Sequence, residues 1–139
     1  MNIKIDLVRL FKDKIEPDFY EYFKEDVENN TIDDDEFITD FFICVFNFCG
    51  CGCLTLSAKF IKEVLNCFEE EEGWSAPHLK LDKLDSYTNN KGITDFILHF
   101  LDTYGITEHG TSVYGSWLTI EGQKLKEYLN EAIKDEEEK

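Results

Sequence analysis

Apolar residues follow the spacing of α-helices along most of the chain. Large apolar side chains recur at intervals of three and four positions, which places them on one face of a helix. By this pattern we expect about five or six helices, near residues 7–15, 17–30, 31–49, 55–68, 93–104 and 119–133. The chain is therefore expected to be mostly α.

Each expected helix has a face that the pattern assigns to the core. Segment 31–49 is apolar over much of its circumference, so we expect it near the centre of the core. In segment 17–30 the expected buried face is Phe19, Tyr22, Phe23 and Val27. In segment 93–104 it is Ile93, Phe96, Ile97, Phe100, Leu101 and Tyr104.

Turn-forming residues mark the limits of these helices and one region with a different pattern. Pro17 suits a first helical turn, and glycines after residues 49 and 104 suit helix ends. Segment 74–87 has no regular pattern, so we expect an irregular stretch lying across the helical core. Segment 106–118 places β-forming residues around Gly110 and Gly115, which predicts a hairpin before the C-terminal helix, itself capped by Thr119.

These elements predict one architecture for the whole chain. We expect a single compact bundle of about five or six helices with a small β-hairpin before the last. The 139 residues suit one domain, 1–139, with frayed ends at 1–5 and 135–139.

The charge of the chain narrows the possible classes of ligand. The chain has 30 acidic residues against 14 basic ones, for a net charge of -16. The acids concentrate at 16–40, where Lys24 is the one base, and at 69–72, where four carboxylates would oppose the dipole of a helix that ended there. Clustered cations are what proteins use to bind nucleic-acid phosphates or anionic membranes, so both classes of ligand are disfavoured.

The acidic face suggests a protein partner instead. The densest run is Asp33, Asp34, Asp35 and Glu36. We take these four as candidate partner-binding residues for a basic protein. Plain solubility and imitation of nucleic acid are the alternatives. The run lacks the alternating ligands and glycine of a calcium loop.

The most distinctive motif is a run of cysteines and glycines at 49–53. Zinc sites use four thiolate or imidazole ligands, and the candidates here are Cys49, Cys51 and Cys53 with Cys67, or with His78 or His109 as the fourth. Single-residue spacing is unusual for zinc, and buried cysteines also serve as small apolar residues that pack a helix end. Packing, without a cofactor, is the favoured interpretation, and a zinc module is the alternative.

Catalysis has less support. Cys51, before an expected helix start, is the best candidate nucleophile, because a helix N-terminus lowers the pKa of a thiol. No recognisable signature places any of the three histidines beside it, and no phosphate-binding glycine loop is present. We therefore assign no catalytic residues, and the sequence favours a non-enzymatic role.

Two short patches carry a family resemblance. GITEHG at 105–110 and YGSWLTIEG at 114–122 look like segments of small uncharacterised phage and prophage proteins, in which a CGCG stretch like that at 49–52 also precedes an amphipathic helix. The resemblance implies a mobile-element setting and no catalytic residues. Residues 118–122 also resemble the strand-to-helix junction of winged-helix domains, although the basic recognition surface is missing.

Together these observations predict a cytoplasmic accessory or regulatory protein that acts by binding another protein through its acidic face. The five cysteines are expected to be reduced, and we see neither a targeting segment nor an apolar run long enough for a membrane span. Self-association is a further possibility, with Trp74, Tyr114 and Trp117 as candidate exposed anchors. A metal-binding module and a cysteine-dependent enzyme are the alternative functions.

Overall fold

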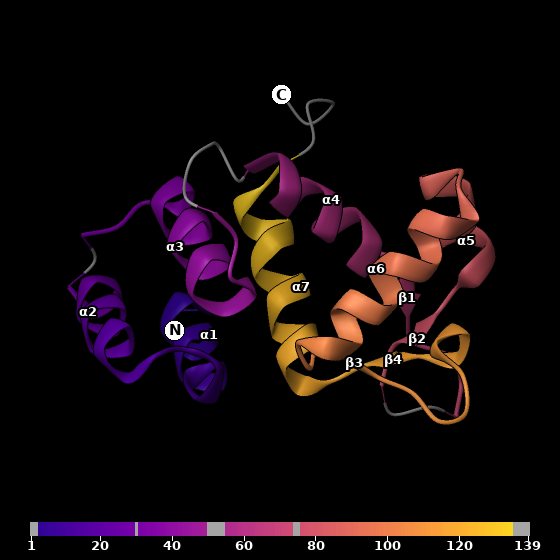
Figure 1. The fold of residues 1–139 in the computed structure, drawn as a ribbon, viewed down its shortest axis with the longest axis horizontal. Helices are drawn as coiled ribbons and strands as arrows, with labels where there is room; N and C mark the ends of the chain where they lie inside the picture. Colours follow the sequence, from indigo (N-terminus) through magenta and orange to yellow (C-terminus); the bar gives the residue numbers. More distant parts are fainter. Residues whose placement is uncertain (1–2, 30, 50–54, 74–75, 135–139) are drawn as a thin grey trace. The chain divides into compact units, whose positions relative to one another are not determined.

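The computed structural model describes residues 3–29, 31–49, 55–73 and 76–134. These residues are mostly helical and include a small four-stranded antiparallel sheet, which confirms the coarse fold class (Figure 1). The chain divides into two units, Met1–Lys59 with Glu127–Lys139, and Phe60–Lys126. The expected single domain stays a prediction, and each unit is described by itself.

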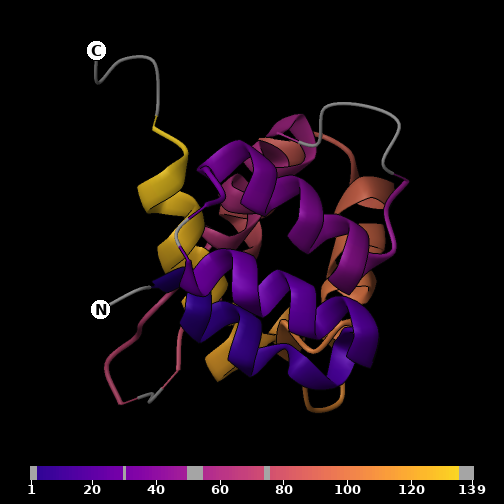
Figure 2. The same cartoon turned by 90° about the vertical axis from the view of Figure 1, so that its left-hand side faces the viewer.

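The first unit is built from helices. In the described residues it holds α1 (Ile3–Leu10), a short 3₁₀ turn η1 (Lys12–Lys14), α2 (Pro17–Glu28) and α3 (Asp34–Phe46). It also includes the start of α4 (Thr55–Leu65) and the end of α7 (Ile120–Ala132). Figure 2 shows α1, α2 and α3 in indigo and purple. Residues 3–5, expected at a frayed end, form part of α1.

Local sequence signals set the limits of these helices. Pro17 occupies the first turn of α2, as expected. Asp33 caps α3, because its side chain accepts a hydrogen bond from the Glu36 amide at 2.8 Å. The helix ends earlier than predicted, at Phe46, because Asn47 adopts the left-handed conformation with φ of 60°.

Aromatic rings from α3 fill the core of the first unit, which confirms the central place predicted for this helix. The Phe37 ring lies 5.2 Å from that of Phe23 and 5.0 Å from that of Tyr128. The Phe41 ring meets Phe11 edge-on at 5.1 Å. Such edge and tilted contacts add to the stability that burial of the rings provides.

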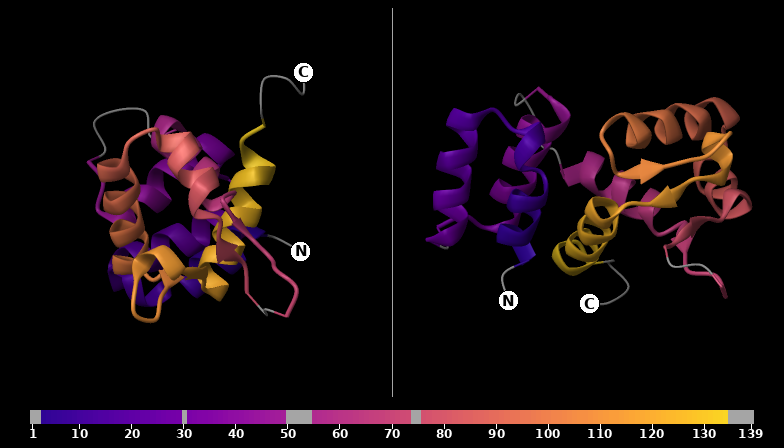
Figure 3. Two further views of the ribbon diagram at one scale, coloured as in Figure 1. Left: turned by 90° about the vertical axis from the view of Figure 1, so that its right-hand side faces the viewer. Right: turned by 90° about the horizontal axis from the view of Figure 1, so that it is seen from below.

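The second unit combines helices with the sheet. Its elements, after the end of α4, are β1 (Phe68–Glu69), β2 (His78–Leu79), α5 (Leu81–Thr88), α6 (Lys91–Thr103), β3 (Thr107–Glu108), a 3₁₀ turn η2 (Val113–Gly115) and β4 (Trp117–Leu118), before α7 begins. The strand order is β1-β2-β4-β3, with every pairing antiparallel. The predicted hairpin is present as β3 and β4, the arrows in the right-hand view of Figure 3.

The segment after α4 departs from the prediction. The helix expected to reach residue 68 ends at Leu65, and Phe68 and Glu69 form an edge strand. The carboxylates predicted to oppose a helix dipole therefore do not lie at a helix end. Instead Glu69 pairs with Lys83 at 2.7 Å and Glu71 pairs with Lys80 at 2.5 Å.

The segment predicted to be irregular is also more ordered than its pattern suggests. Its second half forms α5, and β2 joins the sheet in front of it. In this eight-residue helix Leu84 is the one described side chain assigned to the buried core. One buried residue gives no repeat, so the periodicity rule had nothing to detect.

The C-terminal helix begins at a tight junction. The Thr119 hydroxyl lies 2.7 Å from the Gly105 carbonyl oxygen and accepts a hydrogen bond from the Gly122 amide at 3.0 Å. The predicted Thr119 cap is therefore confirmed. A Cβ atom on Gly122 would lie 2.1 Å from the carbonyl oxygen of Ile106, so only glycine fits there. The junction thus joins the two patches that carry the family resemblance.

Candidate binding surfaces

The four acidic residues at the start of α3 divide into two pairs. Asp33 is engaged as the helix cap. Asp34 accepts a hydrogen bond from the Tyr128 hydroxyl at 2.8 Å and pairs with the Lys4 ammonium at 3.2 Å. Asp35 and Glu36 are exposed and form no ion pair with any described residue. Of the candidate partner-binding residues, these two alone keep their carboxylates available.

The exposed face of α2 carries two aromatic rings. Phe19 is 60% exposed and Tyr22 is 73% exposed, although both were predicted to lie in the core. Phe23 and Val27 are buried as predicted, and Tyr20 joins them on the buried face. The predicted and the observed faces both have spacings of three and four, so periodicity fits either, and packing decided between them.

Carboxylates surround these rings. Asp18, Glu21, Glu25 and Asp26 are exposed, and none forms an ion pair with a described residue. Of the nearby cations, Lys24 and Arg9 both contact Glu28, at 3.9 and 3.7 Å, and Lys12 lies over the Tyr20 ring. The α2 face therefore combines two exposed aromatic rings with uncompensated negative charge.

The negative charge extends from α2 to α3. Burial, followed by the charge of Asp26, raises the pKa of the half-buried Asp40 carboxyl above its ordinary value. The two side chains are thus close enough to repel each other. In the same region, burial and then the Asp40 charge raise the pKa of the Cys44 thiol, which disfavours a reactive thiolate there.

A second apolar face lies on α6. Phe96 is 74% exposed and Ile93 is also exposed, which corrects the inward positions predicted for these two residues. Ile97 and Leu101 are buried as predicted. The buried residues of this helix are Thr94, Ile97, Leu98 and Leu101. A groove of about 280 Å³ is lined by Phe96, His99, Phe100, Thr103 and Tyr104.

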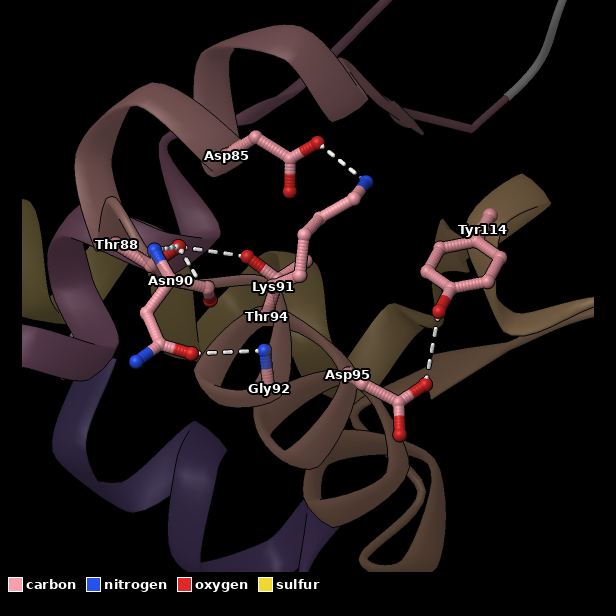
Figure 4. Close-up of polar contacts among 8 residues, drawn as sticks. All are labelled: Asp85, Thr88, Asn90, Lys91, Gly92, Thr94, Asp95 and Tyr114. Carbon is pink, nitrogen blue, oxygen red and sulfur yellow. Dashed lines mark hydrogen bonds and ion pairs between the residues drawn. The ribbon is translucent and has the colours of Figure 1, made fainter.

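The polar groups around the turn between α5 and α6 form a structural clamp (Figure 4). The Lys91 ammonium donates to Asp85 at 2.8 Å, and this bond is the main reason that the pKa of Asp85 lies below its ordinary value. The Thr88 hydroxyl lies 2.6 Å from that of Thr94, which is fully buried. Asn90 caps α6 by accepting from the Gly92 amide at 2.8 Å.

The clamp continues to the 3₁₀ turn η2. The Tyr114 hydroxyl donates to Asp95 at 2.9 Å, and Lys91 lies 5.8 Å from the centre of the Tyr114 ring (Figure 4). Tyr114 is therefore held within its own unit, although its ring stays partly exposed. Nothing in the sequence indicated the pairing of Tyr114 with Asp95.

The cysteines predicted to bind zinc are only partly described. Cys49 is exposed, while Cys51 and Cys53 lie outside the described residues. Cys67 is buried, its thiol lies 3.5 Å from the Glu63 carbonyl oxygen, and burial raises the pKa of that thiol. Among the described residues no three histidines, cysteines or carboxylates are grouped to hold a metal ion. The zinc site and the Cys51 nucleophile stay predictions.

The histidines have local partners of their own. His78 lies in β2, with Nδ1 2.8 Å from the Ala76 carbonyl oxygen and its ring 5.7 Å from that of Trp117. His109 Nδ1 lies 3.0 Å from Asp102 Oδ1, which ties the start of the hairpin to the end of α6.

Trp74, the third candidate anchor for self-association, lies outside the described residues.

Comparison with known proteins gives no further guide to these surfaces. No protein-family model, curated protein or solved structure matches the chain significantly. None of the described helices is both long and apolar enough to pass through a bilayer. The candidate surfaces therefore have to be assessed on their own chemistry.

Proposed function

We propose that this chain is a non-enzymatic accessory or regulatory protein that binds a basic partner protein through the acidic surface of its first unit. We define that surface by the exposed carboxylates of α2 and α3 that have no ion pair among the described residues: Asp18, Glu21, Glu25, Asp26, Asp35 and Glu36. The observation that carries the proposal is this concentration of uncompensated charge. The mobile-element setting that the family resemblance implies belongs to the same proposal.

Charge matching supports a protein over a nucleic acid as the partner. Several described cations pair with carboxylates of the chain itself, as at Lys4, Arg9, Lys83 and Lys91. A phosphate backbone would meet repulsion from the net charge of -16. A basic protein would be attracted and steered toward the surface, with an association rate that falls as salt is added.

Affinity capture from cells of the source organism tests the proposal with two variants of equal charge. The test variant is Glu21→Gln, Glu25→Gln, Asp35→Asn and Glu36→Gln. The matched control is Glu70→Gln, Glu72→Gln, Asp82→Asn and Glu108→Gln, which removes four exposed carboxylates from the second unit. Far-UV circular dichroism checks that both variants fold.

We expect the wild type and the control to capture the same basic protein, with a yield that falls as salt rises. The test variant should lose at least about tenfold of that capture, which corresponds to a few charge contacts. Equal capture by the test variant and the control would contradict the proposal. So would a captured partner that carries net negative charge.

A further inference from the structure

The two exposed rings of α2 lie on one stripe of the helix. Phe19, Tyr22 and Asp26 are spaced by three and four residues, and residues at this spacing share one side of a helix. The stripe therefore begins with two aromatic rings and continues into a carboxylate. Tyr and Phe are enriched at the centres of protein interfaces, where they provide large apolar areas.

The carboxylates determine what kind of molecule suits this stripe. Burial, and then the charge of Asp26, raise the pKa of the Asp40 carboxyl of α3 above its ordinary value. A cation placed beside this pair would remove the repulsion. Asp18 is exposed at the other end of the stripe, one helical turn before Tyr22. Charge complementarity thus favours a partner with basic residues on both sides of an apolar segment.

A recess lies beside the first turn of α2, largely on the side of the helix away from the stripe, and Asp18 borders both. The groove is about 570 Å³ in volume, with Ile15, Pro17 and Tyr20 as its apolar lining and Asp13, Asp18 and Glu21 as its carboxylates. Lys12 already lies 5.2 Å from the centre of the Tyr20 ring in this groove. The apolar stem and charged head of a basic side chain of the chain itself therefore already lie in this recess, which leaves the stripe as the surface for a partner.

The apolar face of α6 offers a comparison. Phe96 is as exposed as Tyr22, but its flanking charges are mixed, with Lys91, Asp95 and His99 nearby on the same helix. That face has no charge pattern that selects one partner chemistry. It provides instead a matched control, because Phe96→Ala removes a ring of similar exposure from a surface of mixed charge.

We propose that α2 is the docking site for an amphipathic basic helix of the partner protein. Apolar side chains of that helix cover Phe19 and Tyr22, and its Lys or Arg residues reach Asp26 and Asp40 at one end and Asp18 at the other. A helix suits this stripe because its own apolar residues repeat at three and four positions. This inference rests on the proposed function and specifies the partner's chemistry.

The test uses the full chain and a defined probe. The probe is a synthetic peptide of about 15 residues with leucines at helical spacing and lysines on both sides, a length at which an isolated helix becomes feasible. A scrambled peptide of the same composition removes the amphipathic pattern but keeps the charge. Binding is measured by fluorescence anisotropy, and the site is mapped by amide chemical shifts in nuclear magnetic resonance spectra.

We expect the amphipathic peptide to shift amides of α2 and of Asp40, and to bind at least about tenfold more tightly than the scrambled peptide. Phe19→Ala with Tyr22→Ala should weaken binding by a similar factor while the salt dependence stays. Asp26→Asn with Asp40→Asn should reduce the salt dependence. Phe96→Ala should change neither quantity.

Three results would overturn the inference: shifts centred on α6, equal binding of the scrambled peptide, or a change of less than about twofold for the Phe19 and Tyr22 variant. The same variant in the affinity capture separates the two proposals. Capture that needs the carboxylates but not the two rings refutes the docking site and leaves the proposed function standing. Capture that does not need the carboxylates refutes the proposed function itself.

Discussion

The hydroxyl of Tyr128, a buried residue near the end of α7, donates a 2.8 Å hydrogen bond to Asp34 in the first turn of α3. Asp34 also pairs with Lys4 at 3.2 Å. Two groups from distant parts of the chain therefore meet one carboxylate inside the first unit. A residue that looked like part of a solvent-facing acidic run proves to hold elements together.

The acidic run should thus separate into structural and binding residues. Asp34→Asn removes the charge that faces Lys4 and weakens the acceptor for Tyr128, so we expect a loss of about 1 kcal/mol in the free energy of unfolding and no change in partner capture. Glu36→Gln should leave stability within about 0.5 kcal/mol and reduce capture. Urea unfolding and the affinity capture measure the two effects. Reduced capture by Asp34→Asn with unchanged stability would show instead that Asp34 binds the partner.

The same contact should make stability depend on pH at the alkaline end. Burial, and then the bond to Asp34, raise the pKa of the Tyr128 hydroxyl above its ordinary value. The folded state therefore keeps a proton that the unfolded state releases above about pH 10. This contribution is fully present below that pH and is lost as pH rises beyond it.

Tyr128→Phe isolates this effect. The variant should lose about 1.5 kcal/mol near neutral pH, because a buried bond to a charged acceptor is gone. Its stability should then decline less steeply than that of the wild type between pH 9 and 11. Thermal unfolding across that range provides the measurement. If stability falls equally with pH in the two proteins, ionisation of Tyr128 is not the cause of the decline.

Local sequence signals predicted the parts of the fold that depend on neighbouring residues. Pro17 at the start of α2 and Thr119 at the start of α7 lie where expected. Each acts through its own backbone within one turn, so its effect needs no knowledge of the rest of the chain. The β3 and β4 hairpin was predictable for a similar reason, since its strands are close in sequence.

The features that sequence reasoning missed depend on contacts between distant segments. Strand β1 pairs with β2 about ten residues later, and β2 pairs with β4. The exposed rings Phe19 and Phe96 belong to helices whose apolar residues cover more than one face, so periodicity could not choose the buried side. The Asp34 contact with Tyr128 joins residues 94 positions apart, and the acidic run carries no sign of it.

The junction at Gly122 gives a sharp prediction for stability. A Cβ atom there would lie 2.1 Å from the Ile106 carbonyl oxygen, a backbone atom that cannot move aside as a flexible side chain can. We expect Gly122→Ala to cost about 1–3 kcal/mol or more, the range for overpacking a closed site. Gly115→Ala is the matched control, because nothing lies within 4 Å of its Cβ position. Equal melting temperatures for the two variants would show that the junction can open freely.

The metal content of the purified protein distinguishes the two interpretations of the cysteine run, packing and a zinc site. Packing of small residues predicts that protein purified without chelator holds less than about a tenth of a mole of metal per chain, because a zinc site with thiolate ligands would retain its ion. Elemental analysis gives this number. Near-stoichiometric zinc that is lost on replacing Cys49, Cys51 and Cys53 with serine would refute packing and support the zinc module. In that case Cys67→Ser identifies the fourth ligand: loss of zinc implicates it, while retained zinc points to His78 or His109.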